Sequence, residues 1–294
     1  MKHPTALHRY TTAAVSSSGK IIGEYSTSFG LACRFLGKLA RRDIGNVYAL
    51  VRLADEIVDG VAQEAGLDVN ATAGELDRLE TQTEAALTTG YSTNLVVHAF
   101  ATTARTHGIS TELTRPFFRS MRADLYHQQH TAASLQEYIY GSAEVVGLMC
   151  LAVFRNMPGT DTSDDELLVT SARRLGAAFQ KVNFLRDLAT DYQYLGRCYF
   201  PGVDPEAFGE DQKRELVAEI RADLAAATPG MRKLDPRARL SVEMAHRLFS
   251  ELTNTLDQRP AGELLSGRVR VNNTRKLAIA AQTVSTALLK KQNS

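Results

Sequence analysis

Residues 48–59 read YALVRLADEIVD, with the periodicity of a helix that lies in a protein interior. At about 100° per residue, four polar residues fall within roughly 60° of one another: Tyr48, Arg52, Asp55 and Asp59. Apolar residues flank this line and cover the opposite side, so little of the helix is suited to water. Two carboxylates on a buried helix require a partner, because an unpaired buried charge is costly.

Residues 180–191, QKVNFLRDLATD, repeat this geometry. Four polar residues share one face within roughly 80°: Gln180, Asn183, Asp187 and Asp191. One acidic pair at this spacing is more often a solvated helix face, but two such stripes are typical of a binding site. Carboxylates brought close together raise each other's pKa unless cations lie between them. Stripes that face each other across a bundle would suit Mg²⁺, with Mn²⁺ as an alternative, and a diphosphate ligand.

This arrangement favours one chemistry. Bridging cations neutralise a diphosphate as it leaves, so an allylic carbocation can form in a pocket sealed from water. Arg52 and Arg186 lie near the stripes and can contact phosphate oxygens in bidentate fashion. The alternative for Arg186 is a salt bridge to an adjacent carboxylate.

Most of the 294-residue chain has helical period, which predicts an all-α fold. Ten helices are expected at about 28–39, 43–61, 73–88, 93–107, 111–128, 135–154, 164–194, 211–227, 237–256 and 274–290. Pro229-Gly230 is expected to separate two of them, and Asp164 to cap another. Short loops favour a single helical domain over 21–294, after a flexible lead-in over 1–20.

Composition excludes several classes of protein. A net charge of +1, from 34 basic and 33 acidic residues, argues against a nucleic-acid partner. Three distant cysteines, Cys33, Cys150 and Cys198, indicate neither a disulfide framework nor a zinc site. The N-terminus has no apolar signal region, and the apolar run Val145 to Phe154 is too short to span a bilayer. We therefore expect a cytoplasmic protein.

Four blocks of sequence resemble the squalene/phytoene synthase family in order and spacing. They are YSTSF at 25–29, Tyr48-x3-Arg52-x2-Asp55-x3-Asp59, Tyr138-x-Tyr140-Gly141-Ser142-Ala143, and residues 180–201 from Gln180 through Gly196-Arg197-x-Tyr199-Phe200-Pro201. The resemblance covers about residues 20–290. It implies the isoprenoid synthase fold, a single helical bundle around a central cavity lined by both aspartate stripes.

The resemblance also implies residue roles. The family joins two identical allylic diphosphates head to head through a cyclopropyl diphosphate. The implied Mg²⁺ ligands are Asp55, Asp59, Asp187 and Asp191, and the implied diphosphate contacts are Arg52, Gln180, Asn183, Arg186 and Arg268. Tyr48 and Tyr138 would face the ionising carbons, although each can instead be a core tyrosine with a satisfied hydroxyl. Ser28 and Phe29 would shape the first substrate's site, with core packing as the alternative for Phe29.

Some positions depart from the family pattern. Tyr25 and Thr27 stand where members often have His and Lys, which removes a cationic phosphate contact. Glu144 stands where many have Gly. The small residues Gly141 and Gly147 can admit a polyprenyl chain or can serve helix packing, and the sequence leaves both open. The basic cluster Arg268, Arg270, Arg275 and Lys276 can close over diphosphate or contact anionic lipid.

The implied function is that of a Mg²⁺-dependent phytoene synthase in carotenoid biosynthesis, acting on two geranylgeranyl diphosphates without NADPH. One alternative is the same chemistry on farnesyl diphosphate, giving dehydrosqualene or squalene. A second is a non-catalytic relative that acts as an assembly factor, which the four retained aspartates disfavour. Apolar substrates and products suggest peripheral contact with the cytoplasmic membrane face. The sequence identifies no protein partner.

Overall fold

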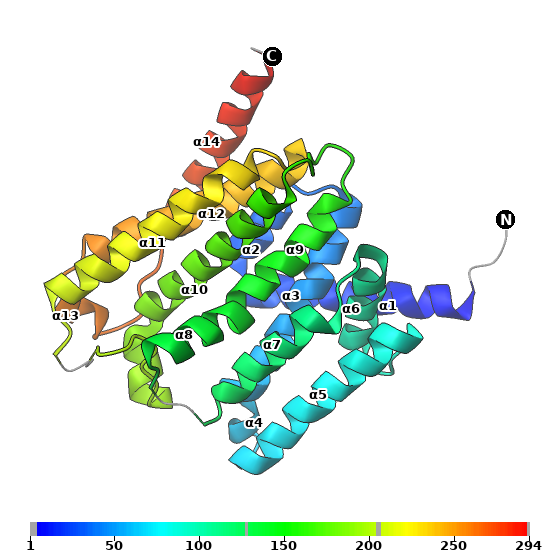
Figure 1. Ribbon diagram of the computed structural model, residues 1–294, viewed down its shortest axis with the longest axis horizontal. Coiled ribbons are helices and arrows are strands. Elements are labelled where there is room, and N and C mark those ends of the chain that lie inside the picture. Colours follow the sequence, from blue (N-terminus) through cyan, green and yellow to red (C-terminus); the bar gives the residue numbers. More distant parts are fainter. Residues whose placement is uncertain (1–4, 127–128, 204–206, 293–294) are drawn as a thin grey trace.

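The computed structural model describes residues 5–126, 129–203 and 207–292, with side chains except at 194–195 and 288–292. This part of the chain is helical and contains no strand, so the predicted all-α class is confirmed (Figure 1). The helices are α1 (Ala6–Tyr25), α2 (Thr27–Cys33), α3 (Lys38–Val58), α4 (Val61–Glu64), α5 (Val69–Thr89), α6 (Leu95–His107), α7 (Thr111–Ala123), α8 (Ala132–Ile139), the π-helix η1 (Tyr140–Glu144), α9 (Val145–Arg155), α10 (Asp165–Leu195), α11 (Glu210–Met231), α12 (Pro236–Asp257), α13 (Ala261–Leu264) and α14 (Asn273–Gln292).

The core consists of packed clusters that α3, α9 and α10 connect. One cluster packs α3 against α5, α6, α7 and α9 around Phe100 and Phe118. Another packs α10 against α11, α12 and α13 around Leu185. A further cluster joins α3, α9 and α10 through Ile44 and Leu168. In Figure 1, α9 and α10 run side by side near the centre, and the C-terminal ends of α3 and α10 both lie toward the lower edge.

The N-terminal segment differs from the expected flexible lead-in over 1–20. Helix α1 begins at Ala6, where the Thr5 side chain caps it, and packs against α3 and α6. Its buried face is made of small residues, Ala14 and Ser18, which are fully buried. Because these residues carry little apolar surface, the hydrophobic pattern did not reveal the helix.

Three predicted boundaries were also wrong. The helix expected over 28–39 ends at Cys33, and α3 begins at Lys38 after Gly37, whose extended backbone forms the N-cap. Helix α7 ends at Ala123 instead of near residue 128. Pro229 lies inside α11, and the helix continues because Gly230 fits against Ser171, whose hydroxyl accepts the Gly230 N–H at 3.0 Å. The predicted cap at Asp164 is confirmed.

The segment Ala132–Arg155 is one helix interrupted only by the π turn η1. By length and composition alone it could cross a membrane, with 24 residues and a mean hydropathy of 1.4 in its most apolar window. The sequence analysis overlooked this because Glu144 interrupts the apolar run but not the helix. Within the bundle, 56% of that window is buried, as in a core helix.

Glycines in this region serve helix packing. A Cβ at Gly141 would lie 2.3 Å from the Pro116 carbonyl oxygen on α7. A Cβ at Gly147 would lie 2.5 Å from the Ala172 carbonyl oxygen on α10. Gly141 and Gly147 were expected either to admit a polyprenyl chain or to serve helix packing, and the structure shows close helix packing at both.

Candidate active site

The first aspartate stripe lies at the C-terminal end of α3. Asp55 is in the last turn, and Asp59 is the C-cap residue, whose N–H donates to the Asp55 carbonyl at 2.8 Å. Gly60 follows with φ +116°, a conformation that glycine adopts readily, and ends the helix earlier than the predicted residue 61. Asp59 therefore leaves the regular helix but stays one turn from Asp55.

Arg197 holds Asp59 in place from the other half of the molecule. Its Nη2 donates to the Val58 carbonyl at 2.9 Å, and its Nη1 donates to Asp59 Oδ1 at 3.1 Å. The last carbonyls of a helix lack partners within it and attract cations, so this guanidinium caps α3. Arg197 is only 7% exposed, and Asp124, Tyr199 and Asp59 outweigh the effect of burial and raise its pKa. The sequence analysis quoted Arg197 in a motif but gave it no role.

The end of α10 explains how Arg197 reaches α3. Gly196 has φ +65°, and its N–H donates to the Tyr192 carbonyl at 3.2 Å. The Arg197 N–H donates to the Asp191 carbonyl at 2.9 Å, so both N–H groups pair with carbonyls in the last turns of α10. The glycine and arginine that follow the second stripe therefore tie it to the end of the first.

The carboxylates of the two stripes act on one another. Burial raises the pKa of Asp55 to about 8, and the charge of Asp59 adds to the effect. Burial also raises the pKa of Asp191 to about 7, with further contributions from Asp187 and Asp59. Because Asp59 on α3 affects the pKa of Asp191 on α10, the structure brings the two stripes into one electrostatic environment. Within the described residues, neither Asp55 nor Asp191 has a side-chain hydrogen bond or ion pair.

Three of the predicted arginines contact carboxylates. Arg186 Nε donates to Asp187 Oδ1 at 2.9 Å, the salt bridge given as its alternative role. Arg268 Nε lies 2.8 Å from the same oxygen. Burial lowers the pKa of Arg268, and the nearby charge of Arg186 lowers it further. Arg52 pairs with Glu56, and its guanidinium lies 4.5 Å from the centre of the Tyr25 ring.

The other predicted contacts lie along α2, α3 and α10. Tyr48 and Phe29 are half-buried, and their rings stack with centres 6.1 Å apart. Ser28 is half-buried on α2, and Gln180 and Asn183 are half-buried on α10. Tyr48 therefore shares α3 with the first aspartate stripe, Gln180 and Asn183 share α10 with the second, and Phe29 links α2 to α3.

Tyr138 is held by a carboxylate that the sequence analysis missed. Its hydroxyl donates to Asp124 Oδ2 at 2.7 Å, while the Tyr199 hydroxyl donates to Oδ1 at 3.1 Å. Burial raises the pKa of Asp124 to about 6, although Arg197 opposes the shift. Tyr138 is 4% exposed, so it fits the alternative of a buried tyrosine with a satisfied hydroxyl. Asp124 falls within the helix expected over 111–128 but follows the end of α7 at Ala123, and it belongs to none of the recognised motifs.

A lysine from α14 lies beside one departure from the family pattern. The Lys276 ammonium donates to the Thr27 hydroxyl at 2.9 Å, beside the position where members often have Lys. Burial lowers the pKa of Lys276, and the charges of Arg270 and Arg186 lower it further. Three cations, Arg186, Arg268 and Lys276, therefore lie near the second aspartate stripe. Within the described residues, Arg186 and Arg268 share the carboxylate of Asp187, and Lys276 donates to a hydroxyl.

These residues fit divalent cations bound together with a diphosphate. Carboxylates are the ligands that Mg²⁺ prefers, and burial, followed by the charge of neighbouring carboxylates, raises the pKa values of Asp55 and Asp191, an effect that bound cations would oppose. No three acidic, histidine or cysteine side chains converge on one point in the described part of the chain. Mg²⁺ rarely uses an all-protein cage, so phosphate oxygens and water would complete the coordination of ions held by these aspartates.

Comparisons with known proteins agree with the family that the sequence motifs resemble. Residues 22–275 match the family described as squalene/phytoene synthase. The chain is 30% identical over 251 residues to a 15-cis-phytoene synthase of Paracoccus sp., covering 80% of this chain and 79% of the relative. It is 29% identical over 205 residues to a 4,4'-diapophytoene synthase of Staphylococcus haemolyticus, which covers 69% of this chain and 68% of that relative.

A solved structure of a dehydrosqualene synthase in complex with ligand superposes with a TM-score of 0.80 at 23% identity, covering 96% of this chain and 99% of that one. This match confirms the predicted isoprenoid synthase type of helical bundle.

Proposed function

The chain belongs to the squalene/phytoene synthase family, a family of prenyltransferase-type enzymes, and we propose that it is a Mg²⁺-dependent phytoene synthase. In this reaction two geranylgeranyl diphosphates join head to head, through a cyclopropyl diphosphate, to give phytoene and diphosphate. The observation that carries the proposal is the meeting of two carboxylate stripes at the ends of α3 and α10, with cations beside them.

The side chains around the stripes have complementary tasks. Bound divalent cations would neutralise the diphosphate and so make it a better leaving group. Arg186, Arg268 and Lys276 would donate to phosphate oxygens, since their present partners are a shared carboxylate and a hydroxyl. Asp55 must lose its proton before it can bind a cation, because its pKa is about 8.

Two aromatic side chains would face the carbon chain. The stacked rings of Phe29 and Tyr48 offer an apolar surface whose π electrons attract a developing carbocation. Tyr138 is 4% exposed and donates to Asp124, so we assign it a structural role beside the site and not contact with the carbon chain. Arg197 acts as a positioning residue, because it holds Asp59 and the end of α3.

The choice of a twenty-carbon substrate rests on the phytoene synthase relative and on the long apolar helix Ala132–Arg155 as a wall for the chain. Each further buried CH₂ is worth about 0.8 kcal/mol, so pocket depth can separate the two substrates. The relative named 4,4'-diapophytoene synthase favours a second candidate, the same chemistry on farnesyl diphosphate.

Product analysis separates these candidates. We expect phytoene from geranylgeranyl diphosphate with Mg²⁺, at least about tenfold lower turnover of farnesyl diphosphate, and no change on adding NADPH. The hydrocarbons would be identified by gas chromatography and mass spectrometry. Turnover of farnesyl diphosphate alone, or a product that requires NADPH, would overturn the proposed substrate and product.

A further inference from the structure

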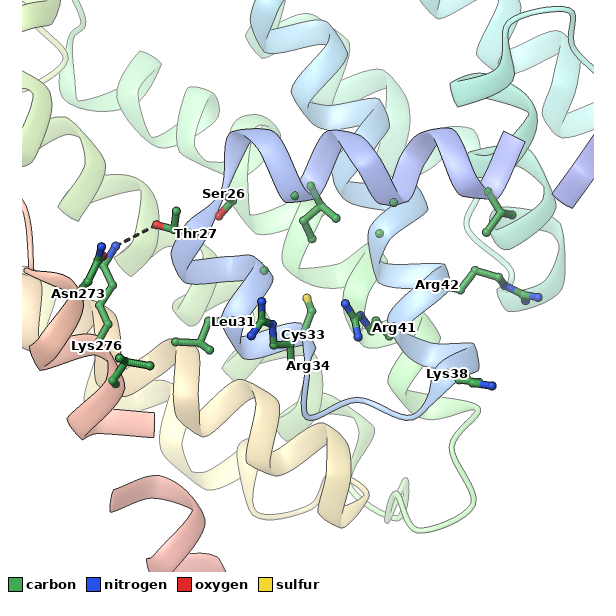
Figure 2. Close-up of a pocket in the computed structure, with 17 residues that line it drawn as sticks. Ser26, Thr27, Leu31, Cys33, Arg34, Lys38, Arg41, Arg42, Asn273 and Lys276 are labelled. Atoms are coloured by element: carbon green, nitrogen blue, oxygen red, sulfur yellow. Dashed lines mark hydrogen bonds between the residues drawn. The ribbon is translucent and has the colours of Figure 1, made fainter. Parts of the chain in front are cut away.

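A cavity whose lining includes none of the aspartates lies between α1, α2, the N-terminal half of α3 and the start of α14 (Figure 2). Its volume is about 660 Å³. Five cations line it: Arg34 directly after α2, then Lys38, Arg41 and Arg42 in the first turns of α3, and Lys276 of α14. No acidic side chain lines the cavity in the part of the chain that the structure describes, although the whole chain has 33 acidic and 34 basic residues. The cavity is therefore a local concentration of positive charge.

Most of this charge is unpaired. Across the described ranges, the side chains of Arg34, Lys38 and Arg41 make no ion pair or hydrogen bond, while Arg42 pairs with Asp43 at 2.9 Å. These four cations are exposed. Cations held together on one face repel one another, so an anionic partner would be attracted there.

The rest of the lining combines apolar side chains with the uncharged polar side chains of Ser26, Thr27 and Asn273. Val15 and Ile22 of α1 and Leu31 of α2 line the cavity, together with several glycines. Two large leucines border the cations and face solvent: Leu277, which lines the cavity and is 63% exposed, and Leu39, which follows Lys38 and is 68% exposed. Cations beside exposed leucines are typical of a surface that contacts phosphate headgroups and inserts side chains among acyl chains.

We propose that this cavity and the turn between α2 and α3 bind the headgroups of anionic phospholipids, and that Leu39 inserts into the membrane interface. A soluble anion would pair with the cations but would leave the exposed leucines in water, so the lipid is the better match. The proposal is independent of the proposed reaction, because the residues that line the cavity include none of the four aspartates. Lys276 at one end of the cavity places the docked surface beside the active site.

Vesicle co-sedimentation tests the charge requirement. The protein should bind vesicles of phosphatidylcholine mixed with phosphatidylglycerol more strongly than vesicles of phosphatidylcholine alone, and added salt should weaken binding. The double variant Arg34→Gln/Arg41→Gln should bind the anionic vesicles roughly 25-fold more weakly, at about fivefold per cation. The matched control Arg78→Gln/Arg214→Gln removes two exposed arginines from α5 and α11 and should bind like the parent.

A fluorescent reporter tests insertion. The chain has no tryptophan, so Leu39→Trp introduces a single probe, whose emission should shift to shorter wavelength with anionic vesicles. The emission of the control Val69→Trp, at a 51% exposed position on α5, should not shift.

Three outcomes would overturn the proposal. They are equal binding to both vesicle types, parent-like binding by Arg34→Gln/Arg41→Gln, and no emission shift for Leu39→Trp. Release from vesicles by inorganic phosphate at constant ionic strength would assign the site to a soluble anion. Circular dichroism would verify that each variant is folded.

Discussion

Replacing Asp55 with Asn should abolish catalysis while making the cation-free protein more stable. Turnover should fall about 10³-fold or more, since metal-mediated stabilisation of a leaving group is worth several kcal/mol. The folded protein should tolerate the change, because Asp55 is half-buried and has no side-chain partner in the described part of the chain. Steady-state kinetics and thermal unfolding with a chelator present would measure both effects.

The gain in stability should depend on pH. The pKa of Asp55 is about 8 in the folded protein and near its usual 3.8 in the unfolded chain. Between these values the folded state holds a proton that the unfolded state has released, so this carboxyl group makes the parent less stable as pH rises from about 4 to 8. Asn cannot ionise, and the variant should therefore gain most near pH 8, by about 1–2 kcal/mol or roughly 3–6 °C in Tm.

A control variant separates the site from a general effect of removing charge. Asp211→Asn, at an 89% exposed side chain on α11, should change neither turnover nor Tm measurably. If Asp55→Asn kept parental turnover, Asp55 would not belong to the catalytic machinery. A Tm for Asp55→Asn that is lower at pH 8 would show that the ionised carboxylate has a stabilising partner.

Gly176→Ala should produce a large loss of stability. A Cβ at Gly176 would lie 2.5 Å from the Ala143 carbonyl oxygen and 3.2 Å from the Glu144 Cα, both in the π turn η1. These atoms belong to the backbone and cannot rotate away, so α10 and η1 must separate. We expect a loss of about 2–4 kcal/mol in the free energy of unfolding, measured by urea denaturation. Gly147→Ala, whose Cβ would meet the Ala172 carbonyl at 2.5 Å, should behave similarly.

The matched control for this prediction is Gly74→Ala. Gly74 lies within α5, and a Cβ there would meet nothing within 4 Å. Alanine favours a helix over glycine by about 0.8–1.0 kcal/mol, so Gly74→Ala should stabilise the protein. Equal effects for Gly74→Ala and Gly176→Ala would show that α10 and η1 do not pack as closely as described.

The sequence predicted what depends on periodicity and missed what depends on contacts across the fold. The stripes on α3 and α10 were visible because helical spacing places their members on one face. Arg197 and Asp124 lie outside helices, and their importance comes from partners distant in the chain, Asp59 and Tyr138. Helix α1 was missed for a related reason, since small residues form its buried face.

Other features needed the packed structure to be interpreted. Gly141 and Gly147 allowed two explanations until the atoms facing them were known. Lys276 is about 250 residues from Thr27 in sequence, yet its ammonium donates to the Thr27 hydroxyl, at the position where the first motif lacks a lysine. Charge counting along the chain gave a net value of +1 and did not reveal the unpaired cations Arg34, Lys38 and Arg41, which lie directly after α2 and in the first turns of α3.

The two aspartate stripes are proposed to hold divalent cations that bind diphosphate, and calorimetric titration with inorganic diphosphate tests this directly. The account predicts binding in Mg²⁺ by the parent, no binding when a chelator replaces Mg²⁺, and loss of binding in Asp55→Asn and Asp187→Asn. Equal affinity for diphosphate with Mg²⁺ and with chelator, or Mg²⁺-dependent binding that survives in both variants, would contradict it.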